Sequence, residues 1–276
     1  MVILVDKVSK IYKSGVEPTL ALANVSFKVP KSCIFCIMGP SGSGKTTLLN
    51  IISGLMRPDT GKVVVLGANF SEMSDKEVFN FRLRNIGYIF QDFKLIDIFT
   101  ARENILLPLV KLGVDWDEGE KRLEKIAKLL GIEDLLDKYP HELSYGEMQR
   151  VAIARELVKD CRIILADEPT SNIDIERKKR VLGYFKELIS KGEKTIVIAS
   201  HDRLVLDYCD YVGELVDGTL ISVLNKEEFM KTYKSQSIEN DWIIEVRKLR
   251  LKLLRHEITE DEFVEEYLKL KEKFYK

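Results

Sequence analysis

The sequence of 276 residues has no excess of charge of either sign, because 43 lysines and arginines are balanced by 44 aspartates and glutamates. Binding of nucleic acid or of an anionic surface through bulk charge is therefore not indicated. The sequence also lacks an apolar run with a length close to the roughly 18 residues that a membrane-spanning helix needs. Asp6 comes too early for the apolar core of a secretory leader. These absences predict a soluble intracellular chain, long enough for one large domain or one domain with an appendage.

Cysteine is also scarce, with four residues in the whole chain. Cys33 and Cys36 form a C-x-x-C pair in KSCIFCIMGP, a spacing that can indicate a metal or redox site. A buried strand is the better interpretation, because residues three apart on a strand point to opposite faces. No second C-x-x-C or Cys/His pair completes a metal site in the sequence. We therefore predict neither a disulfide framework nor a metal site on these cysteines.

Short apolar segments bounded by turn residues alternate with helical patterns along most of the chain. The predicted strands include SCIFCIMG, KVVVLG, NIGYIF, CRIILAD and KTIVIAS. A helix, TLLNIISGLM, is expected to continue to Arg57-Pro58, and ELVDGTLISV is expected to form a hairpin around Asp217-Gly218. The alternation predicts an α/β fold, and the mainly helical stretch at about 93–160 predicts an inserted subdomain.

The character of the sequence changes at about Asn225. Apolar residues then follow a 4-3-4 spacing twice, at Trp242, Val246, Leu249 and Leu253 and at Phe263, Tyr267, Leu270 and Phe274. Thr259 and Glu262 have the spacing of a capping box, which begins a helix. We therefore predict a helical hairpin at 240–256 and 260–275, with a basic first arm and a second arm that begins acidic. The chain would divide into a domain at 1–225 and a C-terminal helical extension at 226–276.

The stretch GPSGSGKT matches the phosphate-binding pattern G-x-x-x-x-G-K-[ST] fully, between a predicted strand and a predicted helix. Glycines let backbone N–H groups wrap phosphates, and the N-terminus of the helix adds its partial positive charge. Lys45 is expected to reach the β- and γ-phosphates, and the Thr46 hydroxyl is expected to bind Mg²⁺. The predicted nucleotide-binding residues of this loop are Gly39, Ser41, Gly42, Ser43, Gly44, Lys45, Thr46 and Thr47.

The segment RIILADEPT provides a second candidate for phosphate chemistry. Its apolar strand ends in Asp167-Glu168, so that two carboxylates lie at the edge of a parallel sheet where ligands bind in such folds. Asp167 would hold Mg²⁺, usually through water, and Glu168 would polarise the attacking water. A solvated strand end looks the same in a sequence, and it is the pairing with the phosphate-binding loop that makes the functional interpretation strong.

The phosphate-binding loop, Gln91, LSYGE, ILADEP and His201 follow one another in the order of the ATP-binding cassette (ABC) ATPases. The chain resembles this family over about residues 1–225. The resemblance implies a RecA-like core with an antiparallel β subdomain and a helical subdomain, and ATP hydrolysis with ATP and Mg²⁺ as cofactors. It also implies that two cassettes close head-to-tail over two ATP molecules, as a homodimer or a heterodimer.

The resemblance implies roles for four further residues. Tyr12 looks like the aromatic residue that stacks on adenine, although a tyrosine at the end of a β segment can simply pack. Gln91 is similar to the glutamine that contacts Mg²⁺ and water and senses the γ-phosphate, and His201 to the switch histidine. Asp174 in SNID matches the aspartate of the D-loop. The family usually has Ala-Leu-Asp there, so that Asn172-Ile173 is a mild departure.

The tetrad in LSYGE resembles the family signature, which binds the γ-phosphate of the ATP held by the opposite protomer. Ser144, Gly146 and Glu147 are its predicted contact residues, and Ser144 and Glu147 also have the spacing of a capping box. Tyr145 stands where the family has the first of two glycines. We expect only Gly146 to need to be a glycine, and Tyr145 to face the opposed protomer or solvent.

The segment GYIFQDFKLIDIFTARENILLPL resembles the subgroup that contains MacB, LolD and FtsE. This implies an integral membrane partner, driven in transport or in mechanotransmission, with the chain peripheral on the cytoplasmic face of the membrane. Residues 92–110 would receive that partner. The alternative that the apolar residues there pack inside the helical subdomain stays open for Phe93, Leu95, Ile96, Ile98 and Phe99.

Two other functions remain as alternatives. One is a soluble ABC ATPase that acts on nucleic acid or ribosomes. It is less favoured because the chain has a single phosphate-binding loop and only about 50 residues between Gln91 and Ser144, with no room for a long coiled coil. The other is a catalytically dead regulatory cassette. The presence of Lys45, Asp167, Glu168 and His201 argues against it.

Overall fold

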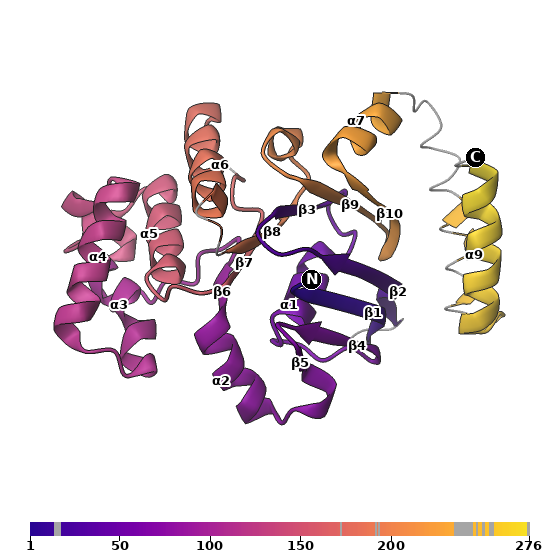
Figure 1. Ribbon diagram of the computed structural model, residues 1–276, viewed down its shortest axis with the longest axis horizontal. Helices are drawn as coiled ribbons and strands as arrows, with labels where there is room; N and C mark the ends of the chain where they lie inside the picture. Colours follow the sequence, from indigo (N-terminus) through magenta and orange to yellow (C-terminus); the bar gives the residue numbers. More distant parts are fainter. Residues whose placement is uncertain are drawn as a thin grey trace. The chain divides into compact units, whose positions relative to one another are not determined.

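The computed structural model describes residues 1–13, 18–171, 173–190, 192, 194–234, 245, 246, 248, 249, 252, 253 and 257–274. The chain divides into two compact units. The first consists of Met1–Val29, Ile37–Ser71 and Asp210–Lys276, and the second of Pro30–Cys36 and Glu72–Cys209. Within the described ranges, no helix is both long and apolar enough to cross a membrane. Strands and helices occur in both units, as the α/β prediction requires (Figure 1).

An antiparallel sheet with the strand order β2-β1-β4-β5 belongs to the first unit. Its strands are β1 (Ile3–Tyr12), β2 (Thr19–Val29), β4 (Thr60–Val65) and β5 (Ala68–Asn69). Ile3 of β1 lies opposite Val29 of β2 on one side and Val65 of β4 on the other. Ile3 and Val5 are fully buried and Leu4 between them is half-buried, because alternate side chains of a strand point to opposite faces. The alternation breaks at Lys7, which is exposed, has φ +51° and lies at a register shift between Val5 and Val8. The predicted antiparallel β subdomain is confirmed.

The first unit also contains a helix and a hairpin. Their elements are the end of β3 (Ile34–Met38), α1 (Lys45–Ile52), β9 (Tyr211–Val216), β10 (Thr219–Asn225) and α7 (Lys226–Lys234). The strand order there is β10-β9-β3. Asp217 and Gly218 both have positive φ angles, 44° and 75°, which two-residue hairpin turns of this kind require. The predicted hairpin is confirmed.

Helix α1 is shorter than predicted. It ends at Ile52 instead of continuing to Met56. The Ser53 hydroxyl donates a hydrogen bond to the Asn50 carbonyl, and Gly54 follows with φ +72°. A left-handed glycine after the last turn ends a helix, because the chain there turns away from the helix axis. The sequence pattern predicted a longer helix because the apolar residues Leu55 and Met56 continue the helical periodicity beyond Ile52.

The C-terminal extension packs on β2 and β10 in the first unit. Helix α9 (Glu260–Phe274) begins with the predicted capping box of Thr259 and Glu262. Three buried residues of the extension join two clusters: Leu249 and Phe263 pack with Leu20 and Ala23, and Val246 packs with Val216 and Ile221. The Tyr267 hydroxyl donates to the Leu220 carbonyl at 3.0 Å. Trp242, Arg247, Arg250 and Arg255 lie outside the described residues.

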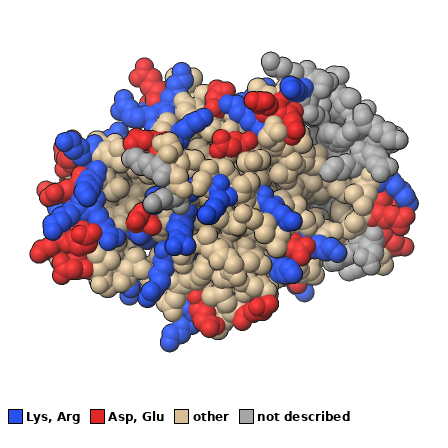
Figure 2. Space-filling view, in the orientation of Figure 1, with Lys and Arg blue, Asp and Glu red and all other residues tan. Residues whose placement is uncertain are grey.

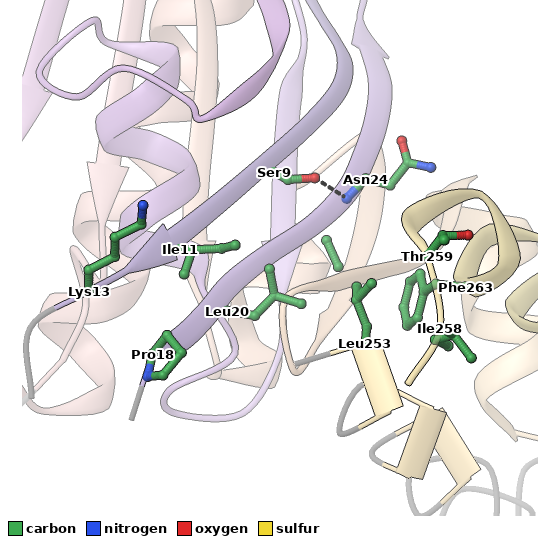
Figure 3. Close-up of a pocket in the computed structure, with 11 residues that line it drawn as sticks. Ser9, Ile11, Lys13, Pro18, Leu20, Asn24, Leu253, Ile258, Thr259 and Phe263 are labelled. Atoms are coloured by element: carbon green, nitrogen blue, oxygen red, sulfur yellow. Dashed lines mark hydrogen bonds between the residues drawn. The ribbon is translucent and has the colours of Figure 1, made fainter. Parts of the chain in front are cut away.

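A cavity of roughly 410 Å³ lies where the extension meets β1 and β2. Figure 3 shows Ile11 and Leu20 on one side of it and Leu253, Ile258 and Phe263 on the other. The backbone N–H of Asn24 donates to the Ser9 hydroxyl at its edge, at 3.0 Å. Most of the surface that encloses the cavity is therefore apolar, and it continues the cluster around Phe263.

The second unit contains parallel strands. Its sheet has the order β3-β8-β7-β6, with β3 contributing its first residues, and comprises β6 (Ile86–Ile89), β7 (Ile163–Asp167) and β8 (Thr195–Ser200). β7 pairs in parallel with both β6 and β8, so that Asp167 at its end lies opposite Ala199 of β8. The carboxyl ends of these strands therefore lie at one edge, where the sequence predicted the catalytic residues.

Helices make up the remainder of the second unit. They are α2 (Asp75–Asn85), α3 (Ala101–Leu112), α4 (Trp116–Leu130), α5 (Tyr145–Leu157) and α6 (Ile175–Ser190). Short 3₁₀ turns occur at Phe70–Glu72, between the units along the chain, and at Glu133–Leu135, Pro140–Glu142 and Arg203–Asp207. Ile105 of α3, Leu123 of α4 and Val151 of α5 are fully buried in one cluster. The predicted helical insertion is confirmed.

The four cysteines are buried and free of disulfides. Cys36 lies in β3, as predicted for a buried strand. Burial raises the pKa of the Cys161 thiol to about 11, which makes it a poor nucleophile at neutral pH. On the face shown in Figure 2, basic and acidic side chains both occur across the surface, in line with the nearly equal numbers of the two signs.

Candidate functional site

The loop between β3 and α1 contains two glycines that leave no room for a side chain. A Cβ atom on Gly39 would lie 2.0 Å from the carbonyl oxygen of Leu215, and one on Gly44 would lie 2.4 Å from that of Ala21. Gly44 also has φ +97°, a conformation that other residues adopt only with strain. The two glycines therefore let the loop pack directly against the backbone of β9 and β2, which fixes the loop just before the start of α1, where a phosphate would bind.

Two polar side chains lie in the same loop. The Lys45 ammonium donates to the carbonyl oxygens of Gly39 and Pro40, both at 2.9 Å, so that it lies over the loop rather than in solvent. The Ser43 hydroxyl is buried and has no hydrogen-bond partner among the described residues. A buried hydroxyl without a partner is costly, and a phosphate oxygen would provide one. The predicted loop residues therefore fit a phosphate group, with Thr46 exposed beside them.

Tyr12, at the end of β1, lies beside helix α1. Its hydroxyl is 3.2 Å from the Thr47 hydroxyl and donates to the Met56 sulfur at 3.4 Å. The strand end is fixed by Asp59, whose carboxylate accepts the Ile11 N–H at 2.6 Å. Tyr12 is half-buried, so part of its ring remains accessible next to the loop. This position fits both predicted roles, packing against α1 and stacking on a base.

The carboxylates of Asp167 and Glu168 lie at the carboxyl end of β7, as predicted. Asp167 is buried. The pKa of the Tyr88 hydroxyl on the neighbouring strand β6 is raised mainly by burial, and in addition by the charge of Asp167. The Glu168 N–H donates to the Ala199 carbonyl at 2.9 Å. Glu168 has φ +49°, a left-handed conformation that costs about 1–2 kcal/mol for a residue with a side chain. The sheet therefore holds Glu168 in a strained backbone conformation.

Glu168 and His201 lie side by side in the second unit. The Nδ1 atom of His201 is 2.8 Å from the Glu168 Oε1 atom, and the Ser200 hydroxyl donates to Oε2 at 3.3 Å. A carboxylate oxygen can accept a hydrogen bond from a protonated Nδ1 atom at this distance. The Glu168 side chain is 9% exposed and that of His201 is 61% exposed. A buried carboxylate with a fixed orientation and an accessible imidazole can together hold a water molecule for attack.

Gln91 follows β6 and is exposed, as expected of a residue that contacts a ligand. Phe93 and Lys94, shortly after Gln91, have positive φ angles of 61° and 48°. Their carbonyl oxygens accept hydrogen bonds from the Arg155 guanidinium, at 2.8 and 2.6 Å. Phe93 is buried, so the inward packing that the sequence left open applies to it.

The signature begins helix α5. Ser144 is its N-cap, and the Glu147 carboxylate accepts the Ser144 N–H at 2.7 Å, which completes the predicted capping box. Hydrogen bonds from the Ser144 side chain and backbone lower the pKa of the Glu147 carboxyl. Gly146 is buried, and a Cβ atom there would lie 3.1 Å from the guanidinium of Arg177. The glycine therefore permits a close approach to α6.

The prediction for Tyr145 needs correction. Its ring does not face outward; it meets the Phe93 ring edge-on at a centroid distance of 4.5 Å, and its hydroxyl donates to the Gln91 carbonyl at 3.5 Å. Tyr145 is the first residue of α5 and does not have a positive φ angle, so that a glycine is not required at this position, as expected. The contact depends on the fold of the segment after Gln91, which the local sequence pattern did not reveal.

The D-loop aspartate also begins a helix. One Asp174 oxygen accepts the Arg177 N–H at 3.0 Å, and the other lies 3.2 Å from the Arg177 Nε atom. Asp174 is exposed. Asn172, the departure from the family pattern, lies outside the described residues.

Three residues near the site were missed by the sequence argument. Ser200 orients Glu168, Arg155 holds the segment after Gln91, and the buried Gln149 amide donates to the Pro169 carbonyl directly after Glu168. For Arg155 a signal existed, since it follows the apolar run Val151–Ala154 of a helix that the sequence predicts to be buried. Buried polar side chains need partners, and those partners are often functional loops.

Comparison with known proteins decides the family. The model of the family described as "ABC transporter" matches residues 22–171. The chain belongs to the ABC transporter family. A protein described as an uncharacterized ABC transporter ATP-binding protein of Methanocaldococcus jannaschii is 42% identical over 217 residues, which are 79% of this chain and 96% of that protein. The lipoprotein-releasing system ATP-binding protein LolD of Bacteroides thetaiotaomicron is 40% identical over 199 residues, 72% of this chain and 91% of LolD.

A solved structure supports the same assignment. It is the dimeric post-hydrolysis state of the ATP-binding cassette MJ0796 bound to ADP and Pi, with 36% identity and a TM-score of 0.78 over 81% of this chain and 98% of that one. The chain is thus an ATP-binding and ATP-hydrolysing subunit of an ABC transporter, and its predicted fold and activity are confirmed. The comparisons favour this function over the alternative on nucleic acid or ribosomes.

Proposed function

We propose that the chain hydrolyses ATP in a head-to-tail pair of cassettes, at residues 1–225, and thereby drives an integral membrane partner on the cytoplasmic face. The single observation that carries the hydrolytic part is the 2.8 Å contact between Glu168 and His201 at the end of a parallel strand pair. Residues 92–110 would receive the partner, and residues 226–276 would be an accessory element.

The phosphates would bind the loop from Gly39 to Thr47. Lys45 and the buried Ser43 hydroxyl offer donors, and the glycines allow the backbone to approach. Ser41, Gly42 and Thr47 complete the set, and Tyr12 would stack on the base. The support is the fit of donors and space, since a phosphate oxygen satisfies a donor that the described residues leave without a partner.

Mg²⁺ would be held by the Thr46 hydroxyl, Gln91 and Asp167. The described residues contain no cluster of three or more His, Cys, Asp or Glu side chains that could bind a metal ion by themselves. This fits Mg²⁺, which keeps several waters and is bound by one or two carboxylates together with substrate phosphates. When bound, the ion would neutralise charge on the transferred phosphoryl group.

Glu168 would orient the attacking water, and His201 would fix the Glu168 carboxylate. With the proton on Nδ1, the other ring nitrogen of a neutral His201 is an acceptor. The Ala199 hydrogen bond fixes the backbone of Glu168, and the contacts of its oxygens with His201 and the Ser200 hydroxyl limit the rotation of the carboxylate. The chain would in this way hold a proton acceptor ready before nucleotide arrives.

Dimerisation would complete each site. Ser144, Gly146 and Glu147 begin helix α5, whose first N–H groups and partial positive charge favour an anion. In the proposal they meet the γ-phosphate held by the other cassette, with Asp174 at the same contact. A two-fold pair of identical chains closes two such sites at once, and a related second cassette would serve equally.

The partner surface would centre on two isoleucines after Gln91. Ile98 is 78% exposed and Ile96 is 38% exposed, whereas Leu95 packs partly into the helical core. Large exposed apolar side chains on a short segment are typical of protein contacts. We infer from this exposure, and from the likeness of the segment to LolD-type chains, that it receives a segment of the membrane subunit.

Substitution of Glu168 by Gln tests the proposal. The variant keeps the size of the side chain and one acceptor oxygen, but its amide nitrogen can accept neither a hydrogen bond nor the proton, so ATP binding is expected to persist while hydrolysis slows at least about 100-fold. An ATP-bound pair should then accumulate and be visible by size-exclusion chromatography with light scattering. A Glu168→Gln chain that binds ATP and remains monomeric, both alone and with its cognate second cassette, would refute the proposed shared site.

A further inference from the structure

Helix α5 holds the segment after Gln91 at two places. At the start of the helix, the Tyr145 ring meets the Phe93 ring at 4.5 Å with an interplanar angle of 68°, and its hydroxyl reaches the Gln91 carbonyl. Near its end, the Arg155 guanidinium donates to the Phe93 and Lys94 carbonyls. One helix thus fixes both the side chain and the backbone of this segment.

The segment is strained, and the anchors keep it so. Phe93 and Lys94 both have left-handed φ angles, 61° and 48°, which residues with a side chain adopt only with strain. Such conformations persist only where the surroundings determine them. Arg155 is itself oriented by Glu156, with Nε and Oε1 3.1 Å apart, and the side chains of both are buried. The position of Gln91 therefore depends on contacts made by α5.

Tyr145 lies between Ser144 and Gly146 in the sequence. Those two neighbours are proposed to meet the nucleotide of the opposite cassette, whereas the Tyr145 ring turns back to the segment that carries Gln91. A glycine at this position, as in the family pattern, has no side chain that could make this contact. The link is thus a property of this sequence.

We propose that Tyr145 is a positioning residue for hydrolysis, which sets Gln91 of its own chain through the Phe93 ring. The inference rests on the proposed roles of Gln91 and the signature. A tilt of α5 on engagement of the signature would move the aromatic contact, and with it the backbone at Gln91. Arg155, farther along the helix, would keep the strained turn intact during that movement.

The test compares steady-state ATP hydrolysis by full-length variants. Tyr145→Ala keeps helix propensity and removes the ring. Edge-to-face aromatic pairs are worth about 0.5–1.5 kcal/mol, which corresponds to a loss of roughly two- to tenfold in kcat. KM for ATP should stay within about twofold, because the phosphate-binding loop is untouched. Tyr145→Phe keeps the ring and should restore kcat, and Tyr139→Ala, on a half-exposed tyrosine that stacks on His141, is the matched control.

A double-mutant cycle with Phe93 tests whether Tyr145 affects hydrolysis through the Phe93 ring. Phe93→Leu preserves an apolar side chain at the buried position and removes the second ring. If Tyr145 acts through Phe93, the double variant should lose no more kcat than the worse single variant. Losses that multiply would overturn the inference, as would a Tyr145→Phe variant as slow as Tyr145→Ala.

Formation of the ATP-bound pair by the Glu168→Gln variant, with and without Tyr145→Ala, distinguishes failure of this inference from failure of the proposed function. Tyr145→Ala on that background should still form the ATP-bound pair, because the backbone of the signature is unchanged. Loss of the pair only when Tyr145 is replaced would mean that the ring contacts the opposite nucleotide, and the positioning role would be wrong. Failure of Glu168→Gln alone to pair would count against the proposed function and leave the kinetic cycle to judge Tyr145.

Discussion

His201 Nδ1 and Glu168 Oε1 are 2.8 Å apart, one on an exposed residue and the other on a buried carboxylate. This contact joins the ends of two adjacent parallel strands. A change that breaks it removes one of the hydrogen bonds that orient the Glu168 carboxylate, while the Ser200 hydroxyl still donates to Oε2 and the strands stay in place.

Replacement of His201 by Ala should therefore slow hydrolysis without weakening ATP binding. General acid–base groups that are correctly placed contribute on the order of 100-fold, and loss of orientation should remove about that factor from kcat. Rapid-quench assays for kcat and fluorescent-nucleotide titration for affinity make the comparison. His141→Ala, on another exposed histidine of the same unit, should be neutral. Equal losses in both histidine variants would contradict the assigned role.

Replacement of Ile98 by Asp should uncouple the chain from its membrane partner. The side chain is 78% exposed, so a charge there costs the isolated fold little, whereas burial of an unpaired carboxylate against a partner is costly. Basal ATPase activity should be retained, and stimulation by the reconstituted membrane subunit should fall at least about tenfold. Leu129→Asp, an exposed apolar position on α4, is the control. Unchanged stimulation in the Ile98 variant would rule out this surface.

The ion pair of Lys178 and Asp202, at 2.6 Å, should make stability depend on acid pH. Burial raises the pKa of Asp202. The hydrogen bonds from Lys178 and from the Leu204 N–H, together with the charge of Lys178, lower it by more than burial raises it, so that the net pKa is below the usual 3.8. A carboxyl with a lowered folded pKa stabilises the protein above its unfolded pKa, and that stability is lost as pH falls through the folded value.

Lys178→Gln should consequently lower Tm at pH 6–7, and the difference from the parent should shrink below about pH 4 as Asp202 becomes protonated. Differential scanning calorimetry from pH 3 to pH 7 measures it. Lys179→Gln, on an exposed neighbour in the same helix, should give no such pH dependence. A Lys178→Gln difference that persists unchanged at pH 3 would show that the pair has a packing role only.

Substitution of Phe263 by Ala should loosen the C-terminal extension. Phe263 is 2% exposed in the cluster with Leu20 and Leu249, and deletion of a buried Phe costs about 3–5 kcal/mol. The effect should appear as rapid proteolytic cleavage within residues 226–276, with the remaining domain resistant. Leu268→Ala, which is 52% exposed on the same helix, should leave the cleavage rate unchanged. Equal resistance of the Phe263 variant would mean that the extension does not depend on this cluster.

The sequence was sufficient where chemistry depends on neighbours in the chain. The loop at Gly39, the carboxylates after β7 and the capping box of Ser144 and Glu147 are local patterns, and each lies where it was predicted. Tyr145 was misplaced because its contact is with Phe93, far away in the chain. The end of α1 was misplaced because apolar periodicity continued past Gly54, whose left-handed backbone the pattern does not display.

The neighbouring residues Ile11 and Tyr12 of β1 contact different parts of the first unit. Tyr12 reaches Thr47 and Met56 beside the phosphate-binding loop, whereas Ile11 packs in the cluster that receives the C-terminal extension. Side chains alternate across a strand, so loss or gain of one residue in β1 would send each of these two side chains toward the other's partners. Insertion or deletion of one residue at the end of β1 should therefore be tolerated far less than a substitution. Insertion or deletion of two residues keeps the alternation and should be tolerated better than a change of one.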